Sequence, residues 1–245
     1  WVDLANAYGS VKHSLVQFSL EWYHVPEHFR EIIFNYYEGL MAAVLVKGET
    51  TKWFRFKIGV FQGCTASTTL FNVAFNTVFD HLEPLCEELG YQFKKTPVKI
   101  LNTAYADDLG LVAGARPGRS AQANNQEAVD ALNVWLEWSR MKAKPKKCVT
   151  MALIKGQPVD PELTIKVGEE VHQMAFISHG DDPSFKFLGR FLLANLSEDT
   201  EKGGAAEKLQ GSGGEDRGIA VEGKVEGVDT GELCNAKKQL VVPYP

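Results

Sequence analysis

The sequence lacks the patterns that mark disulfide-rich proteins, cysteine-histidine metal sites and membrane proteins. It has only four cysteines among 245 residues, and none follows the Cys-x-x-Cys or Cys/His spacing of a metal site. Isolated cysteines are typical of reduced thiols, so we expect an intracellular chain, with no preference between nucleus and cytoplasm. No apolar run reaches the roughly 20 residues of a membrane-spanning helix, and no signal peptide is visible. We therefore expect no membrane partner.

The sequence also lacks the positive charge that is typical of nucleic-acid-binding proteins. Its formal net charge is −5. Residues 197–245 hold ten acidic and six basic residues, so residues 1–196 are almost neutral, with 21 acidic and 20 basic residues. Basic clusters remain at 94–99 and 140–147. They are equally compatible with phosphate contacts and with solvated helix ends.

Residues 197–245 have few apolar positions and nine of the 22 glycines. Such a segment cannot bury enough apolar surface to offset the entropy lost on ordering. We therefore expect a folded domain over 1–196 and a disordered, acidic, glycine-rich tail over 197–245. A tail that is not a native continuation of the domain is an alternative explanation of the abrupt change in composition.

Hydrophobic periodicity in residues 1–196 predicts an α+β domain with an antiparallel sheet backed by helices. Apolar residues at helical spacing predict four helices, at 11–23, 26–39, 67–89 and 120–141. Runs of strand length predict a hairpin across 41–58 and strands at 148–154, 163–167, 171–177 and 185–192.

The most informative stretch is the pair Asp107-Asp108 between the apolar runs 98–105 and 109–113. It predicts a tight β-hairpin with both aspartates at its tip. Alone, such a tip is also typical of a solvated acidic turn. An antiparallel sheet can bring it beside Asp3, which ends a short apolar strand. Three converging carboxylates would repel one another, and Mg²⁺ ions, which prefer oxygen ligands, would resolve that repulsion.

Five stretches of the chain resemble, in order, motifs A to E of reverse transcriptases of non-LTR (LINE-type) retrotransposons. The resemblance runs from Trp1 to about Leu193 and rests on these stretches: Asp3-Leu4-Ala5-Asn6-Ala7-Tyr8, Gln62-Gly63-Cys64, Tyr105-Ala106-Asp107-Asp108, Lys146-Lys147-Cys148 and Phe187-Leu188-Gly189. It implies a polymerase palm. The fingers region upstream of motif A, a thumb and an endonuclease signature are not apparent. Because the chain begins at Trp1, inside an apolar stretch, we expect a palm fragment.

The resemblance implies an RNA-directed DNA polymerase that uses an RNA template, a DNA primer and dNTP. Asp3 and Asp107 would hold two Mg²⁺ ions, with Mn²⁺ as a possible substitute, and Asp108 would support the metal site. Lys147 would approach the leaving pyrophosphate as a cation or proton donor. A role as one of several surface lysines is an equal alternative for Lys147.

Further residues are assigned to the substrates by the same resemblance. The ring of Tyr8 would leave no room for a 2′-hydroxyl and so favour dNTP over NTP. Gln62, Gly63 and Tyr105 would shape the nucleotide pocket. The primer grip would consist of Phe187, Leu188 and Gly189.

Two departures from the family pattern and two alternatives stay open. Gly9 stands where the family commonly has Asp, and Thr65-Ala66 stands where Pro is common; neither change removes a metal ligand. The chain is an active polymerase, or it is an inactive retrotransposon-derived fragment that at most binds nucleic acid. Another palm polymerase, such as a group II intron maturase, is a third interpretation. The oligomeric state is not readable from the sequence.

Overall fold

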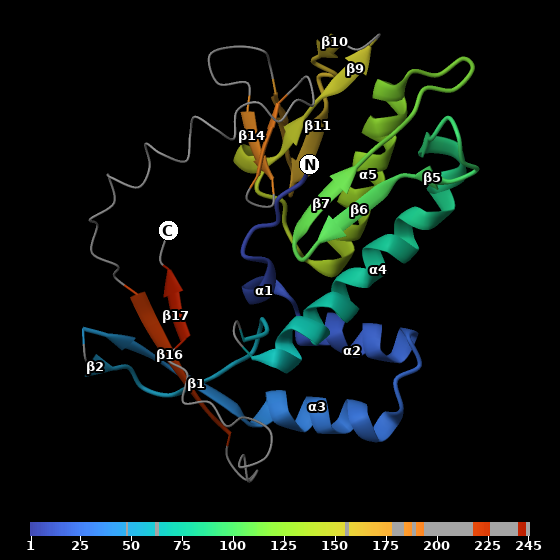
Figure 1. The fold of residues 1–245 in the computed structure, drawn as a ribbon. Helices are drawn as coiled ribbons and strands as arrows, with labels where there is room; N and C mark the ends of the chain where they lie inside the picture. The colour runs from blue at the N-terminus through green and yellow to red at the C-terminus, as the bar shows by residue number, and fades with distance from the viewer. Residues whose placement is uncertain are drawn as a thin grey trace. The chain divides into compact units, whose positions relative to one another are not determined.

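A computed structural model of the chain describes residues 1–47, 49–61, 64–154, 157–177, 184–187, 190–193, 218–225 and 240–243 (Figure 1). The chain divides into two compact units. The first unit contains Trp1–Ala5 and Val78–Gly213, and the second contains Asn6–Thr77 and Gly214–Pro245. Helices and small, mostly antiparallel sheets occur in the same chain, which confirms the predicted α+β class.

The second unit begins with three helices. They are α1 (Ala7–Ser10), α2 (His13–Trp22) and α3 (Glu27–Gly39). Pro26 is the N-cap of α3, and its carbonyl accepts from the amide of Phe29. Because N–H groups at a helix start have no acceptor within the helix, the missing N–H of Pro26 costs α3 nothing. The buried positions of α2 lie on one face, as the apolar pattern predicts, and comprise Leu15, Val16, Ser19 and Leu20.

A five-stranded sheet completes the second unit. Strand β1 (Leu40–Val46) pairs antiparallel with β2 (Glu49–Thr50) and β3 (Phe54–Arg55), which confirms the predicted hairpin. On another side β1 pairs with β16 (Gly218–Val225), which in turn pairs with β17 (Leu240–Pro243).

Within residues 197–245, which we expect from composition to be disordered, the structure describes the segments β16 and β17. The register of β1 and β16 runs from Leu40↔Val225 to Leu45↔Ala220. A strand such as β1 presents a row of backbone donors and acceptors at its edge, and a distant segment can complete it. The other residues of 197–245 lie outside the described part of the chain.

Two long helices carry much of the apolar core. Helix α4 (Thr65–Leu89) runs through Pro84 rather than ending there, and it contributes residues to both units. Helix α5 (Ala121–Ser139) lies in the first unit, and the hydroxyl of its N-cap Ser120 accepts from the amide of Ala123 at 3.1 Å. Fully buried side chains recur along the two helices at spacings of three and four: Phe71, Ala74, Val78 and Leu82 in α4, and Ala128, Leu132 and Leu136 in α5. No described helix is long and apolar enough to span a membrane.

The strands of the first unit form two-stranded pairs. Strand β6 (Asn102–Tyr105) pairs with β7 (Asp108–Leu111), and the two lie side by side in Figure 1. The other antiparallel pairs are β4 (Tyr91–Gln92) with β5 (Lys99–Ile100), β9 (Ala152–Ile154) with β10 (Gln157–Val159), β11 (Thr164–Val167) with β12 (Glu170–Gln173), and β14 (Ser184–Phe187) with β15 (Arg190–Leu193). Strand β8 (Val149–Thr150) pairs in parallel with β13 (Ala175–Phe176), and a 3-10 turn, η1 (Pro145–Lys147), precedes β8.

Candidate active site

The segment Trp1–Ala5 lies between two other segments of the first unit. On one side Val2 and Leu109 of β7 exchange backbone hydrogen bonds, with N···O distances of 2.8 Å and 3.2 Å. On the other side the amide of Ala5 donates to Lys142, and the amide of Lys144 donates to Asp3, each at 2.8 Å. The segment therefore acts as a central strand between β7 and residues 142–149.

This register places Asp3 beside Asp108. Val2 and Leu109 form a hydrogen-bonded antiparallel pair, so the next pair toward the hairpin turn is Asp3 and Asp108. In a pair without mutual hydrogen bonds the side chains approach closely. Val2 is 2% exposed and Leu109 is 0% exposed, so they face the core. Because side chains alternate along a strand, Asp3 and Asp108 lie on the opposite face.

The hairpin turn consists of Ala106 and Asp107. Tyr105 and Asp108 pair across it in register, so Asp108 is the first residue of β7. This corrects the expectation that both aspartates form the tip. Ala106 has φ of 53°, in the left-handed region where a non-glycine residue costs about 1–2 kcal/mol. The turn thus carries backbone strain directly beside the acidic residues.

The carboxylates of Asp3, Asp107 and Asp108 interact electrostatically. The pKa of Asp108 is raised, first by partial burial and then by the nearby carboxylates of Asp107 and Asp3. Lys147 opposes the rise. Its Nζ lies 3.5 Å from Oδ2 of Asp3, and η1 positions it on the segment that pairs with Trp1–Ala5. The structure therefore brings together four residues that the sequence singled out.

The donor set suits a hard divalent cation in its chemistry. All three side chains offer carboxylate oxygens, the ligands that Mg²⁺ prefers. The pKa of Asp108 is raised by partial burial and then by the carboxylates of Asp107 and Asp3, and a bound cation would offset the repulsion among the three carboxylates. Among the described residues, however, no group of three or more His, Cys, Asp or Glu side chains is already arranged to hold a metal ion. The carboxylates are thus neighbours within electrostatic reach rather than a preassembled cage.

The buried side chain of Cys148 contacts the backbone that carries Asp3. Its side chain is fully buried, and its Sγ lies 3.4 Å from the carbonyl oxygen of Lys144 and 3.9 Å from that of Asp3. Burial raises the pKa of the thiol, so it stays protonated and able to donate. The sequence identified Cys148 only as part of motif D.

Tyr8 belongs to the second unit, where its ring stacks on Phe71 of α4. The ring centroids are 4.4 Å apart and the planes differ by 11°. The carbonyl of Tyr8 accepts from the amide of Val60 at 2.8 Å. Gly59, with φ of 88°, approaches so closely that a Cβ there would lie 2.9 Å from Cα of Gly9. Tyr8 is therefore held both through its ring and through its backbone.

Sequence reasoning missed these supports of Tyr8. In the sequence, Phe71 is one of several apolar residues of the predicted helix 67–89. The structure places Gly59 and Val60 against the backbone of Tyr8 and Gly9. The single available signal was the glycine at position 59.

Of the remaining predicted residues, Tyr105 lies beside the acidic residues, Phe187 lies in another hairpin, and the others lie outside the described part. Tyr105 ends β6 and is 67% exposed. Phe187 ends β14 and pairs with Arg190 across a hairpin, and its side chain is not described. Gln62, Gly63, Leu188 and Gly189 lie outside the described residues.

Comparison with known proteins identifies the family. Residues 1–191 match the family "Reverse transcriptase (RNA-dependent DNA polymerase)". The chain belongs to this reverse transcriptase family. The match covers all five motifs, from Asp3 through Phe187-Leu188-Gly189.

The relatives of this reverse transcriptase domain come from R2 elements. It is 29% identical over 196 residues to the "Retrovirus-related Pol polyprotein from type-1 retrotransposable element R2" of Nasonia vitripennis, covering 77% of the chain and 17% of the relative. It is 29% identical over 186 residues to the Pol polyprotein from type-2 element R2DM of Drosophila melanogaster, covering 76% and 16%. A type-1 R2 polyprotein of Popillia japonica is 25% identical over 194 residues, covering 77% and 29%.

These relatives confirm the predicted non-LTR type. The reverse transcriptase domain spans less than a third of the length of each of them.

Proposed function

We propose that this reverse transcriptase domain is an RNA-directed DNA polymerase palm that transfers a nucleotide from dNTP to a primer 3′-hydroxyl. The observation that supports the proposal most is the backbone pairing of Val2 with Leu109. It unites Asp3 with Asp107 and Asp108, which lie about a hundred positions away. A solvated acidic turn would need no such partner.

In this proposal Asp3 and Asp107 hold two Mg²⁺ ions, or Mn²⁺, and the carboxylate of Asp108 supports the metal site. Bound metal would lower the pKa of the primer hydroxyl and neutralise charge on the triphosphate. Lys147, which pairs with Asp3 at 3.5 Å, is near enough to turn toward the leaving pyrophosphate and to donate a proton from Nζ.

The other assigned residues select and hold the substrates. Tyr8, supported by Phe71, excludes a ribose 2′-hydroxyl beneath the incoming nucleotide. By the family resemblance, Gln62, Gly63 and Tyr105 would shape the nucleotide pocket. The hairpin of β14 and β15 positions the primer through Phe187, Leu188 and Gly189. The RNA template and DNA primer follow from the family.

A second candidate is a retrotransposon-derived fragment that binds nucleic acid without catalysis. The chain spans 16% to 29% of the length of the R2 relatives that it matches. In the family, the fingers region upstream of motif A supplies further basic contacts to the triphosphate. An intron maturase is less consistent with the R2 relatives.

Primer extension separates these candidates. The chain, alone and fused behind the fingers region of an R2 reverse transcriptase, is assayed on poly(rA)/oligo(dT) with Mg²⁺ or Mn²⁺. We expect Asp107→Asn to reduce extension at least about a thousandfold, because losing a metal ligand removes charge stabilisation in the transition state.

The matched control is Glu169→Gln, which neutralises an exposed acid in the turn between β11 and β12. It should leave extension within about twofold. Extension that survives Asp107→Asn would refute the two-metal assignment. A fused chain that binds primer-template but never extends it would favour the non-catalytic candidate.

A further inference from the structure

A hairpin of the first unit, residues 90–100, carries only positive charges. We call it the lysine hairpin. It contains Lys94, Lys95 and Lys99 and no acidic residue, in a chain whose net charge is −5. Its strands β4 and β5 pair through Tyr91↔Ile100 and Gln92↔Lys99. The hairpin is therefore one of two local basic clusters in the almost neutral residues 1–196.

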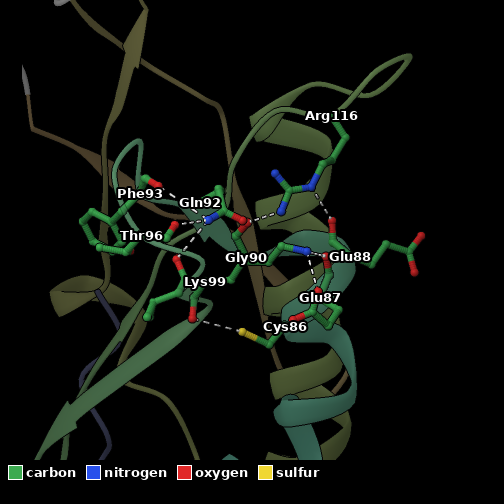
Figure 2. A network of polar contacts seen from close by, with 10 residues as sticks. Cys86, Glu87, Glu88, Gly90, Gln92, Phe93, Thr96, Lys99 and Arg116 are labelled. Carbon is green, nitrogen blue, oxygen red and sulfur yellow. Dashed lines mark hydrogen bonds and ion pairs between the residues drawn. The ribbon is translucent and has the colours of Figure 1, made fainter.

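The side chain of Gln92 holds the loop of the lysine hairpin in shape. Its Nε2 donates to the carbonyl of Thr96 at 2.6 Å, with longer contacts of 3.5 Å to the carbonyls of Phe93 and Val98 (Figure 2). The amide of Thr96 donates back to Phe93 at 3.4 Å. An ordered loop loses less entropy when it binds a partner.

The base of the hairpin is tied to the end of α4. Lys99 Nζ donates to the carbonyl of Glu87 at 2.7 Å and also pairs with the Glu87 carboxylate. Arg116 donates to the carbonyl of Gly90 at 2.6 Å (Figure 2). The charge of Lys99 is thus paired with Glu87 within the fold. Lys94 and Lys95 lie in the exposed turn at the tip.

Two aromatic rings flank this tip. Tyr91 and Phe93 are two positions apart and form an edge-to-face pair with centroids 5.2 Å apart. They are 39% and 45% exposed. An edge-to-face neighbour leaves at least one broad face of each ring uncovered, and every base can stack on such a face.

We propose that the lysine hairpin binds single-stranded RNA, with phosphates on Lys94 and Lys95 and bases stacked on Tyr91 and Phe93. Adjacent lysines without a carboxylate complement a polyanion, and exposed aromatic rings complement unpaired bases. The choice of RNA rests on the proposed function, in which the template strand is RNA.

The lysine hairpin is separate from the acidic face. Ile100 precedes the start of β6, whereas Asp107 follows its end, so the four residues of β6 separate the two features by about 13 Å along the strand. The hairpin would therefore contact the template away from the reacting nucleotide. Its binding does not need an intact catalytic site.

Fluorescence anisotropy tests the proposal on the full chain with a labelled 15-nucleotide U-rich RNA, at 50 mM and 200 mM salt. We expect Lys94→Glu/Lys95→Glu to weaken binding at least about tenfold at low salt. The slope of log affinity against log salt should fall by about 1.4, since each single-strand phosphate contact contributes about 0.7. We expect Tyr91→Ala/Phe93→Ala to weaken binding at least about fivefold.

Matched controls change lysine charge or remove an aromatic ring at exposed positions outside the lysine hairpin. Lys52→Glu/Lys166→Glu makes the same change in charge at exposed lysines, and Trp53→Ala removes an exposed aromatic ring. Hairpin variants that bind within about twofold of these controls would overturn the proposal. So would equal affinity for a fully paired RNA duplex, or weakened binding of oligo(dT) without weakened binding of RNA.

Two further measurements separate this proposal from the polymerase. Asp107→Asn should leave RNA affinity unchanged, so a failure of catalysis would not touch the hairpin. Crosslinking of 4-thiouridine RNA should map to residues 90–100 in the unmutated chain, which removes any dependence on how the aromatic variants fold. Crosslinks confined to other segments, or capture of a protein on the hairpin without RNA, would contradict it.

Discussion

At single residues the most consequential feature is the charge around Asp108. Partial burial, and then the carboxylates of Asp107 and Asp3, raise its pKa, while Lys147 lowers it. Because the pKa is higher in the folded than in the unfolded chain, folding favours the protonated form. The free energy of unfolding must then fall as pH rises through the unfolded and folded pKa values.

We therefore expect Asp108→Asn to stabilise the metal-free chain at pH 7. The gain should stay below about 1 kcal/mol, because like charges paired across strands repel only modestly near solvent. Thermal melts in EDTA check it, and the difference from the unmutated chain should vanish near pH 3. An Asp108→Asn chain that melts lower at pH 7 would show that the carboxylate is needed for the fold.

Phe71 is the second residue whose role the structure reveals, because it stacks on Tyr8 at 4.4 Å. We expect Phe71→Leu to lower the preference for dTTP over UTP, since a smaller side chain lets the Tyr8 ring tilt. Relative incorporation of the two nucleotides by the fused polymerase measures this. Tyr8→Ala should have the same effect, only larger.

Leu132→Val, a buried change in α5, is the control for a general loss of stability. It should alter extension without altering the ratio of the two nucleotides. If Tyr8→Ala changes the ratio and Phe71→Leu does not, the stack does not hold the ring.

Among the elements, the C-terminal end of α4 is hydrogen-bonded by groups from outside the helix. Carbonyls at this end accept from side chains: that of Glu87 from Lys99, and those of Glu88 and the following Gly90 from Arg116 (Figure 2). The carbonyl of Leu89 accepts from the amide of Gly114. Carbonyls at a helix end have no partner within the helix, so these contacts replace the missing ones.

We expect Arg116→Ala to lower the free energy of unfolding by about 1–3 kcal/mol, because it leaves carbonyls of this helix end without their charged donor. Urea denaturation measures it. Arg119→Ala is the matched control, since the side chain of Arg119 pairs with the exposed carboxylates of Glu88 and Glu127, and it should cost less than about 1 kcal/mol. Equal costs would mean that Arg116 acts only as a surface charge.

For the whole molecule, the notable fact is that the first five residues belong to the first unit, although residues 6–77 belong to the second. Trp1–Ala5 are joined by backbone hydrogen bonds to residues 109 and 142–149. Their protection from hydrogen exchange should therefore follow those segments.

Hydrogen exchange checks this arrangement with two cavity variants. Leu109→Ala should speed exchange in residues 1–5 and 142–149 together, while residues 13–22 change much less. Leu20→Ala, at a buried position of α2, should do the reverse. Each substitution should cost about 2–5 kcal/mol. Exchange of residues 1–5 that follows α2 in both variants would contradict the division into units.

Local patterns were sufficient for much of this molecule. Periodicity located the long helices, Pro26 and Ser120 marked two helix starts, and five short motifs in order indicated the family. These signals are short in range, because a helix or a hairpin is stabilised by neighbours in sequence and a motif is recognised residue by residue. They showed which residues carry the chemistry without showing how those residues meet.

Long-range pairing decided the rest. Backbone bonds between Val2 and Leu109, with both side chains in the core, select the one register that sets Asp3 beside Asp108. A shift of one residue would have turned the aspartates inward. The strain at Ala106, the stack of Phe71 on Tyr8 and the pairing of β16 with β1 likewise depend on segments far apart in the chain. Hydrogen bonding and burial across the fold establish them, and neither is visible in a local pattern.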